Sequence, residues 1–279
     1  MLNDVIELFQ FPFMQRALMG GILTGLTGGL LGSLTVVRQL SFFSDALGHS
    51  AMLGVSLGII LGISSPTAVV LPFALLFALG VTYLIEKTDL WTDALLNLIY
   101  SSSLAISVIV LSLSGEFQGN IQTLLFGDIL ALSPSDLIIS AGLFLLCSLF
   151  MGLTLRTQML LTLNEGLAIA RGVNVRLHRN AFMVLLSLLV ATSIKAIGVL
   201  LIGAFVVIPA CTARTLSRNF TSYVLISAGL GAFSAAVGIV SSGVLNTPSG
   251  PSIVVAQFIL FLAALVLLLK RRATQKKGR

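Results

Sequence analysis

The chain has 279 residues, of which 57% are hydrophobic and only 9% are charged, and its mean hydropathy is +1.07. An ordinary soluble domain is about 25% charged, and a disordered chain lacks so many large apolar residues, so both classes are excluded. The sequence predicts an all-α, polytopic bundle of transmembrane helices.

Nine segments are apolar and long enough to cross a bilayer, since about 20 apolar residues span its hydrocarbon core. In chain order they lie near residues 14–36, 41–63, 66–86, 92–113, 135–155, 177–194, 196–215, 221–243 and 250–270. The division within 177–215 depends on Lys195, which is poorly placed in lipid, so eight spans are the alternative. We expect an extracytoplasmic segment at 1–13, a transmembrane domain at 14–270 and a basic cytoplasmic tail at 271–279.

The basic residues predict the orientation of the spans, because Lys and Arg are enriched in cytoplasmic loops. With the C-terminus in the cytoplasm, nine spans place fourteen of the sixteen basic residues on that side and leave Arg16 and Lys195 outside. Eight spans would leave one basic cluster outside. The net charge of +6 and the pI near 9.8 therefore reflect membrane topology, and we expect no binding to nucleic acid.

Small residues recur through the first two spans and predict close helix packing, with a dimer or gating face as the alternative. They are Gly21, Gly25, Gly28, Gly29 and Gly32 in the first span and Ala46, Ser50, Gly54, Gly58 and Gly62 in the second. Cys147 and Cys211 both lie in apolar runs. We interpret them as small buried hydrophobes, and no disulfide framework is expected.

One carboxylate, Asp45, is predicted to lie inside a span. His49 follows Arg38 by eleven residues, about 16 Å along a helix, so it lies near the middle of the bilayer. Asp45 is one turn earlier on the same face and needs a compensating partner at that depth. A carboxylate and an imidazole suit manganese, zinc or ferrous iron, and a symmetric dimer would supply two of each. A proton relay and a structural Asp–His hydrogen bond are the alternatives.

A loop at about 157–176 is predicted to be cytoplasmic and to contain a short surface helix. Asn164 can cap the start of this helix, Glu165 suits its positive end, and Gly172 can end it. The helix is either an inert connection or a docking element for a cytoplasmic partner. His178 lies between Arg176 and Arg179 nearby, and we interpret it as a solvated residue and not as a metal ligand.

Pro209 falls within the seventh predicted span, where a proline removes one backbone hydrogen bond and bends the helix. This bend is either a hinge or a static kink. The chain has no G-x-x-x-x-G-K-[ST] sequence, so any ATP hydrolysis is expected of a separate chain. No catalytic set of nucleophile, His and Asp is present, and the sequence does not predict an enzyme.

Four segments together resemble the permease subunits of the manganese, zinc and iron class of ABC importers, the ABC-3 family. They are SDALGHS at 44–50, LFGDIL at 125–130, E-x-x-A-x-x-x-G at 165–172, and GVLL followed by IPA-x-TAR within 198–214. The segments occur in the order that this family has them, and the resemblance covers roughly residues 10–270.

The resemblance implies a homodimeric permease in the plasma membrane of a prokaryote. Two copies of a cytoplasmic ATP-binding subunit and an extracytoplasmic solute-binding lipoprotein are its expected partners, with ATP on the partner subunit and no permanently bound cofactor. Manganese is the favoured ion, with zinc or iron as alternatives, and an organic metal chelate is disfavoured. The alternative from another class is a proton-coupled secondary transporter.

The resemblance also implies roles for individual residues. Asp45 and His49 match the family's metal-transit pair. Three residues, Glu165, Ala168 and Gly172, match the loop that docks on the ATPase. Gly127 and Asp128 are candidates for the outer gate.

Overall fold

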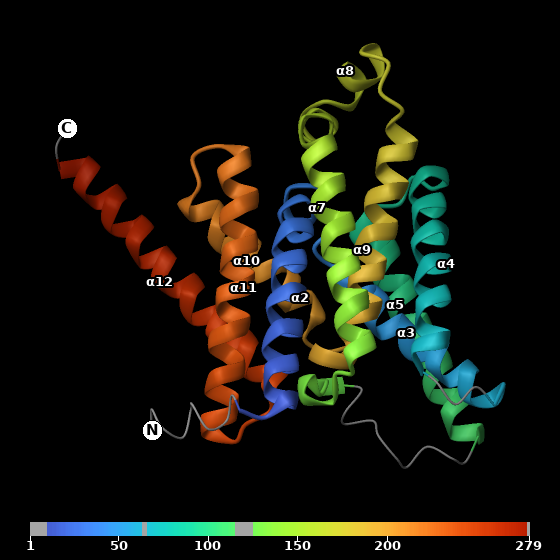
Figure 1. Cartoon of the computed structure of the whole chain (residues 1–279). Coiled ribbons are helices and arrows are strands. Elements are labelled where there is room, and N and C mark those ends of the chain that lie inside the picture. The colour runs from blue at the N-terminus through green and yellow to red at the C-terminus, as the bar shows by residue number, and fades with distance from the viewer. Residues whose placement is uncertain (1–9, 63–65, 115–124, 278–279) are drawn as a thin grey trace. The chain divides into compact units, whose positions relative to one another are not determined.

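A computed structural model describes residues 10–62, 66–114 and 125–277, and every regular element in those ranges is a helix (Figure 1). Most of the predicted segment 1–13 and the last two residues of the predicted tail lie outside the described residues. The all-helical prediction is therefore confirmed for the part of the chain that the structure describes.

Each of the nine predicted spans corresponds to one helix in the described ranges. They are α2 (Pro12–Val37), α3 (Phe43–Ile60), α4 (Pro66–Lys87), α5 (Thr92–Ser114), α7 (Pro134–Leu163), α9 (Val175–Ile197), α10 (Ile202–Leu216), α11 (Phe220–Leu245) and α12 (Ser249–Lys277). Within the same ranges, seven are long and apolar enough to cross a membrane, all except α3 and α10. The predicted number of about nine spans is therefore approximate.

The stretch 177–215 is divided, as predicted, but Lys195 does not break it. Lys195 lies in the last turn of α9, and the helix ends at Gly198, whose φ of 89° and ψ of 158° no helix allows. The Gly198 N–H still donates to the carbonyl of Ile194 at 2.8 Å. Because the break follows the glycine and not the charge, α10 begins at Ile202, six residues later than predicted.

The helix α12 continues past the predicted span into the basic tail, as far as Lys277. Ala, Gln and Lys are good helix formers, and the segment from 271 to 277 contains no Gly or Pro that would end the helix earlier.

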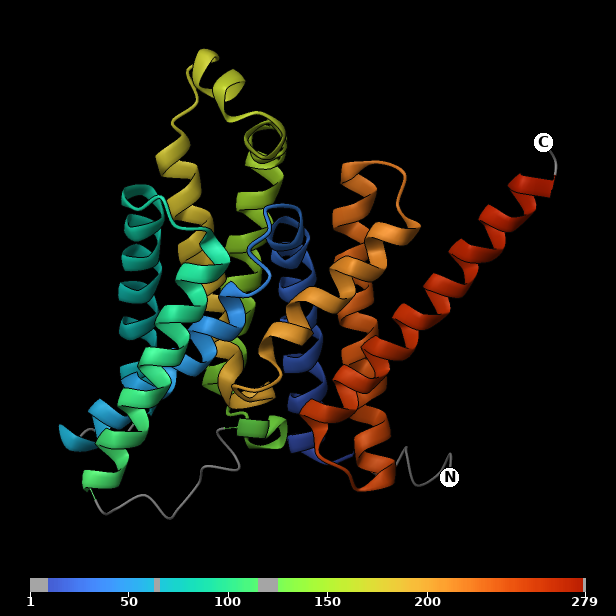
Figure 2. The same ribbon diagram turned by 180° about the vertical axis from the view of Figure 1, so that it is seen from behind.

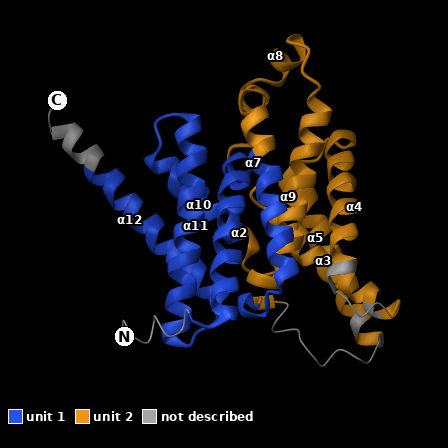
Figure 3. Cartoon of the chain, in the orientation of Figure 1, with its two compact units in different colours: residues 1–36, 128–148, 204–279 blue, residues 37–127, 149–203 orange. Residues whose placement is uncertain are grey.

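The chain forms two compact units (Figure 3). Unit 1 comprises residues 1–36, 128–148 and 204–279, and unit 2 comprises residues 37–127 and 149–203. The helices α7 and α10 each contribute residues to both units.

In unit 1, the glycines of α2 let its backbone lie against α11 and α10. A side chain at Gly25 would meet the carbonyl carbon of Gly231 at 2.7 Å, and one at Gly29 would meet Cα of Ala228 at 2.6 Å. The Ser227 hydroxyl donates to the carbonyl of Gly29 at 2.7 Å. These glycines therefore serve helix packing inside one unit, which was the simpler of the two predicted roles.

In unit 2, α3 packs against α4, α5 and α9, and Figure 2 shows α3 and α5 side by side. The small residues of α3 serve the same purpose as those of α2, because a side chain at Gly54 would meet the ring of Phe73 at 2.8 Å and one at Gly58 would meet Val69 at 2.7 Å. Cys147 of α7 is buried, Cys211 of α10 is half-buried, and both thiols are free, as predicted.

Candidate functional site

Asp45 lies in the first turn of α3, and its carboxylate is bound by the first turn of α10. The backbone N–H of Gly203 donates a hydrogen bond to this carboxylate. A Cβ atom at Gly203 would lie 2.5 Å from Oδ2 of Asp45, so only a glycine leaves room for this contact. A helix N-terminus carries a positive partial charge. The α10 N-terminus thus supplies the kind of compensating partner that the sequence predicts Asp45 to need.

His49 lies one turn after Asp45 and packs against an aromatic ring of α5. The rings of His49 and Tyr100 are T-shaped, with centroids 4.8 Å apart and planes at 82°. Tyr100 in turn packs edge-on against Phe42, with centroids 5.8 Å apart. This contact restricts the rotation of the imidazole.

The polar atoms around the pair are unusually free of partners. Among the described residues, Nδ1 of His49 and the hydroxyls of Ser44 and Ser50 are buried without a hydrogen bond. No Asp45–His49 hydrogen bond joins the two side chains in this part of the chain. A purely structural Asp–His pair, one of the alternatives from the sequence, would need that bond, and buried polar atoms without partners are uncommon in folded proteins.

One copy of the chain supplies few metal ligands. Across the described ranges, no group of three or more His, Cys, Asp and Glu residues could hold a metal ion. Asp45 and His49 offer one oxygen and one nitrogen donor, a set that suits manganese, zinc or ferrous iron. Two donors are too few for a closed metal site, so such a site would need donors from elsewhere.

The predicted surface helix is present as α8 (Glu165–Ala170). The Asn164 side chain caps it by accepting the N–H of Leu167 at 3.0 Å. Gly172, with φ of 77°, ends it, and the Val173 N–H donates to the carbonyl of Ala168 at 3.0 Å. Together with the Gly172 N–H, which donates to the carbonyl of Ile169 at 2.9 Å, this last bond forms the Schellman motif expected after a helix. The loop is shorter than predicted, since α7 continues to residue 163.

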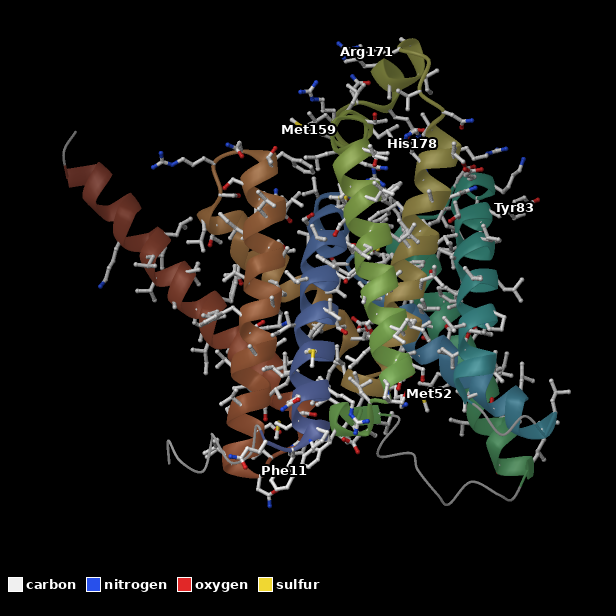
Figure 4. All side chains as sticks on the ribbon, viewed as in Figure 1. Phe11, Met52, Tyr83, Met159, Arg171 and His178 are labelled. Carbon is white, nitrogen blue, oxygen red and sulfur yellow. The ribbon has the colours of Figure 1, made fainter. Side chains whose placement is uncertain are left out.

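Ion pairs connect α8 to two other helices of unit 2. The Arg179 guanidinium on α9 donates to both carboxylate oxygens of Glu165, at 2.9 and 3.0 Å. It also lies 3.7 Å from Glu86 of α4, which Arg176 approaches at 3.1 Å. Figure 4 shows Arg171 and His178 at this same end of the unit. Nδ1 of His178 lies 2.9 Å from the carbonyl oxygen of Asn174, a local contact that agrees with a residue outside any ligand set.

A cavity of about 440 Å³ opens beside α8, and two arginines, Arg38 and Arg179, lie on its wall. The Arg38 guanidinium donates to the side chain of Gln158 and to the hydroxyl of Thr162, and it lies 4.8 Å above the ring of Phe182. Burial, together with the charge of nearby Arg179, lowers the pKa of Arg38 to about 10, so it stays charged at neutral pH. From the sequence Arg38 was only a boundary charge. The sequence offered no clear signal for this partner, because Gln158 follows Arg156 and Thr157 beyond the predicted span.

Two of the four motifs contact each other through their backbones. Gly127 has φ of 70°, and a Cβ atom on it would lie 2.5 Å from the backbone N of Gly198 and from the carbonyl carbon of Ile197. The Leu200 N–H donates to the carbonyl of Leu125 at 3.1 Å. Gly127 and Gly198 are therefore needed for this close approach.

Asp128, the other candidate for the outer gate, has a local role. Its side chain accepts the N–H of Leu130 at 3.0 Å and caps the short 3-10 helix η1 (Ile129–Ala131). Pro209 lies inside α10, as predicted.

The chain is similar to known proteins along almost its whole length. The ABC 3 transport family matches residues 10–268. The manganese import system permease protein ScaB of Streptococcus gordonii is 30% identical over 99% of both chains. The high-affinity zinc uptake system membrane protein ZnuB of Haemophilus influenzae is 33% identical over 91% of this chain and 97% of that protein. The structure of PsaBC from Streptococcus pneumoniae in complex with a Fab has a TM-score of 0.85 and 29% identity, covering 99% of this chain and 100% of that chain.

Proposed function

Because the chain belongs to the ABC 3 transport family, we propose that it is the membrane-spanning permease subunit of an ATP-driven importer of divalent metal ions. Manganese is the favoured ion, since the similar ScaB proteins are named for manganese import. The similar ZnuB protein is named for zinc uptake, so zinc is the alternative within the family. Both ions accept a carboxylate oxygen and an imidazole nitrogen.

The observation that carries this proposal is the state of the Asp45–His49 pair. The two side chains are half-buried on one face of α3, and the buried Nδ1 of His49 is unpartnered among the described residues. The ion is the substrate, so a site of few ligands suits it, because the ion must also leave. Two copies of the chain around an axis would bring together two carboxylates and two imidazoles.

The short helix α8 is proposed to dock on a cytoplasmic ATP-binding subunit, with two copies of that subunit serving the dimer. Glu165, Ala168 and Gly172 form the docking element, and ATP binds to the partner. The ion pairs of Arg179 with Glu165 and Glu86 connect α8 to α9 and α4. A displacement of α8 would therefore reach the helices that pack against α3.

The remaining parts of the proposal concern the two sides of the membrane. The C-terminus lies in the cytoplasm, the protein resides in the plasma membrane, and an extracytoplasmic solute-binding lipoprotein delivers the ion. Gly127 and Asp128 are proposed to shape the outer gate. The backbone contact of Gly127 with Gly198 supports this, because it gives the segment a defined shape next to the start of α10.

The test replaces Asp45 with Ala and measures uptake of radioactive manganese in cells that lack the native copy. We expect Asp45→Ala and His49→Ala to abolish uptake, because each removes one ligand. Asp93→Ala is the matched control, since Asp93 is also an acidic residue in the first turn of a helix, α5, but is exposed. Uptake at the normal rate by an inserted and assembled Asp45→Ala protein would refute the transit role.

A proton-coupled secondary transporter is the competing function, and reconstitution separates the two. The purified chain in proteoliposomes is given a proton gradient and no ATP-binding subunit. We expect no uptake until the subunit and ATP are added. Uptake driven by the gradient alone would favour the competing function.

A further inference from the structure

Pro209 leaves one carbonyl of α10 without its helical partner. In an α-helix each N–H donates to the carbonyl four residues earlier, and a proline has no N–H to donate. The acceptor that Pro209 should serve is the carbonyl of Phe205. Phe205 is 1% exposed, so water cannot serve this carbonyl instead, and an unpaired carbonyl in an apolar interior is costly.

A side chain of α12 supplies the missing donor. The Gln257 amide nitrogen, Nε2, donates to the carbonyl oxygen of Phe205 at 3.3 Å. Gln257 is 2% exposed, although it lies in the middle of one of the most apolar helices of the chain. Phe205, Pro209 and Gln257 all belong to unit 1, so the contact lies within one compact body.

Burial of the Gln257 amide costs free energy, and its hydrogen bond to the Phe205 carbonyl offsets part of this cost. Its Oε1 atom is buried and has no hydrogen-bond partner among the described residues. A buried polar side chain with one unpaired atom destabilises the fold unless its other polar atom forms a hydrogen bond with a group that would otherwise be unpaired. Donation to the Phe205 carbonyl is that contribution.

On its other side, the same turn of α10 is enclosed by α2. A Cβ atom at Gly28 would lie 3.1 Å from the ring of Phe205, and one at Gly32 would lie 3.1 Å from the carbonyl carbon of Val206. The turn before Pro209 therefore packs closely against the glycines of α2 and accepts a hydrogen bond from Gln257 of α12. Such close packing restricts bending of α10 at this turn.

We propose that Gln257 replaces the backbone donor that Pro209 lacks and ties α12 to α10 at this bend. The bend is then a fixed kink that α10 and α12 carry together, and not a free hinge between the two halves of α10. The bond itself follows from the geometry alone. Its meaning for transport rests on the proposed function: the movement that opens the permease must occur elsewhere than within this turn.

A double-mutant cycle tests the proposal on the full chain purified with its ATP-binding subunit. The variants are Gln257→Leu, Pro209→Ala and the two combined, all with the half-buried Cys211 replaced by Ser, and the unfolding equilibrium is followed by dye labelling of buried Cys147. An interhelical hydrogen bond inside a membrane protein changes that equilibrium by about 3- to 20-fold. We expect Gln257→Leu to favour unfolding by that factor when Pro209 is present. In the Pro209→Ala background we expect about 2-fold or less, because the alanine restores a backbone N–H at this position that serves the Phe205 carbonyl.

Ser234→Ala is the matched control, because the buried Ser234 hydroxyl bonds to a carbonyl of its own helix, Gly231, at 3.0 Å. Its effect should be the same in both backgrounds. An equal effect of Gln257→Leu in both backgrounds would overturn the proposal. If Pro209→Ala assembles poorly, Pro209→Leu restores the same N–H and completes the cycle. The assay needs no metal and no ATP, so its failure would leave the transit role of Asp45 untouched, and the reverse also holds.

Discussion

Replacing Gly198 with Ala should strongly destabilise the protein, because two independent penalties fall on one methyl group. The backbone at Gly198 has φ of 89° and ψ of 158°, a region that only glycine occupies readily. The added Cβ atom would also lie 2.5 Å from the backbone N of Gly127 and from the carbonyl carbon of Phe126. Both neighbours are backbone atoms and cannot turn aside as a side chain could.

The size of the effect follows from these two terms. The conformational strain costs about 1–3 kcal/mol, and forcing a methyl group into a packed site costs about another 1–3 kcal/mol. The alanine recovers about 0.4–1 kcal/mol by restricting the unfolded chain. The net loss is therefore about 1–6 kcal/mol, a large share of the stability of about 5–15 kcal/mol that is typical of folded proteins.

Thermal unfolding of the purified permease complex measures this loss, again through labelling of buried Cys147. Gly152→Ala in α7 is the matched control, because no atom lies within 4 Å of the Cβ that it adds. In a helix this exchange is neutral or stabilises by up to about 1 kcal/mol. A Gly198→Ala protein that melts at the same temperature as the Gly152→Ala protein would refute the close contact between the two motifs.

Two further predictions concern side chains that the structure brings to the sites. Tyr100→Leu should raise the KM for metal uptake about 2- to 10-fold, because an edge-to-face contact contributes about 0.5–1.5 kcal/mol to holding the imidazole, whereas Tyr100→Phe should keep the normal value; equal KM values for both variants would contradict the positioning role. Arg38→Ala should lower the free energy of unfolding by about 1–3 kcal/mol, because it leaves the buried side chain of Gln158 without its donor. Thermal melts of Arg38→Ala and of the control Arg156→Ala test this, because Arg156 takes part in none of the ion pairs among the described residues. Equal melting temperatures of the two variants would contradict the prediction.

Much of the fold could be predicted from the sequence because its signals are local. The apolar runs locate the nine helices that correspond to the predicted spans in the described ranges, because a helix satisfies most of its own backbone hydrogen bonds without a distant partner. The cap at Asn164 and the glycine at Gly172 predict α8 for the same reason. The spacing of Asp45 and His49 also suffices to place both on one face of a helix. Each of these inferences uses residues within a few turns of one another.

The tertiary structure decided which partners those residues have. The sequence predicts that Asp45 needs a partner, but the N–H of Gly203 that serves it lies more than 150 residues away in the chain. Tyr100 beside His49 and Gln257 on the carbonyl of Phe205 are likewise pairings between separate helices. No local pattern encodes them, because a backbone donor has no residue type and a single polar side chain in an apolar run does not indicate its acceptor.

The low content of charged residues identifies a membrane protein, but it does not say which partner each remaining polar group contacts. In a low-dielectric interior each remaining polar group must find a compensating partner. The sequence by itself determined which groups need a partner from elsewhere in the chain. Two examples are the Asp45 carboxylate and the carbonyl that loses its hydrogen bond because Pro209 has no N–H. Only the packing of helices that are distant in the sequence decided which partners these groups contact. The energy of such contacts depends on how closely two helices approach, and glycines such as Gly203 and Gly28 permit a close approach. The spacing of residues in the sequence does not show these distances.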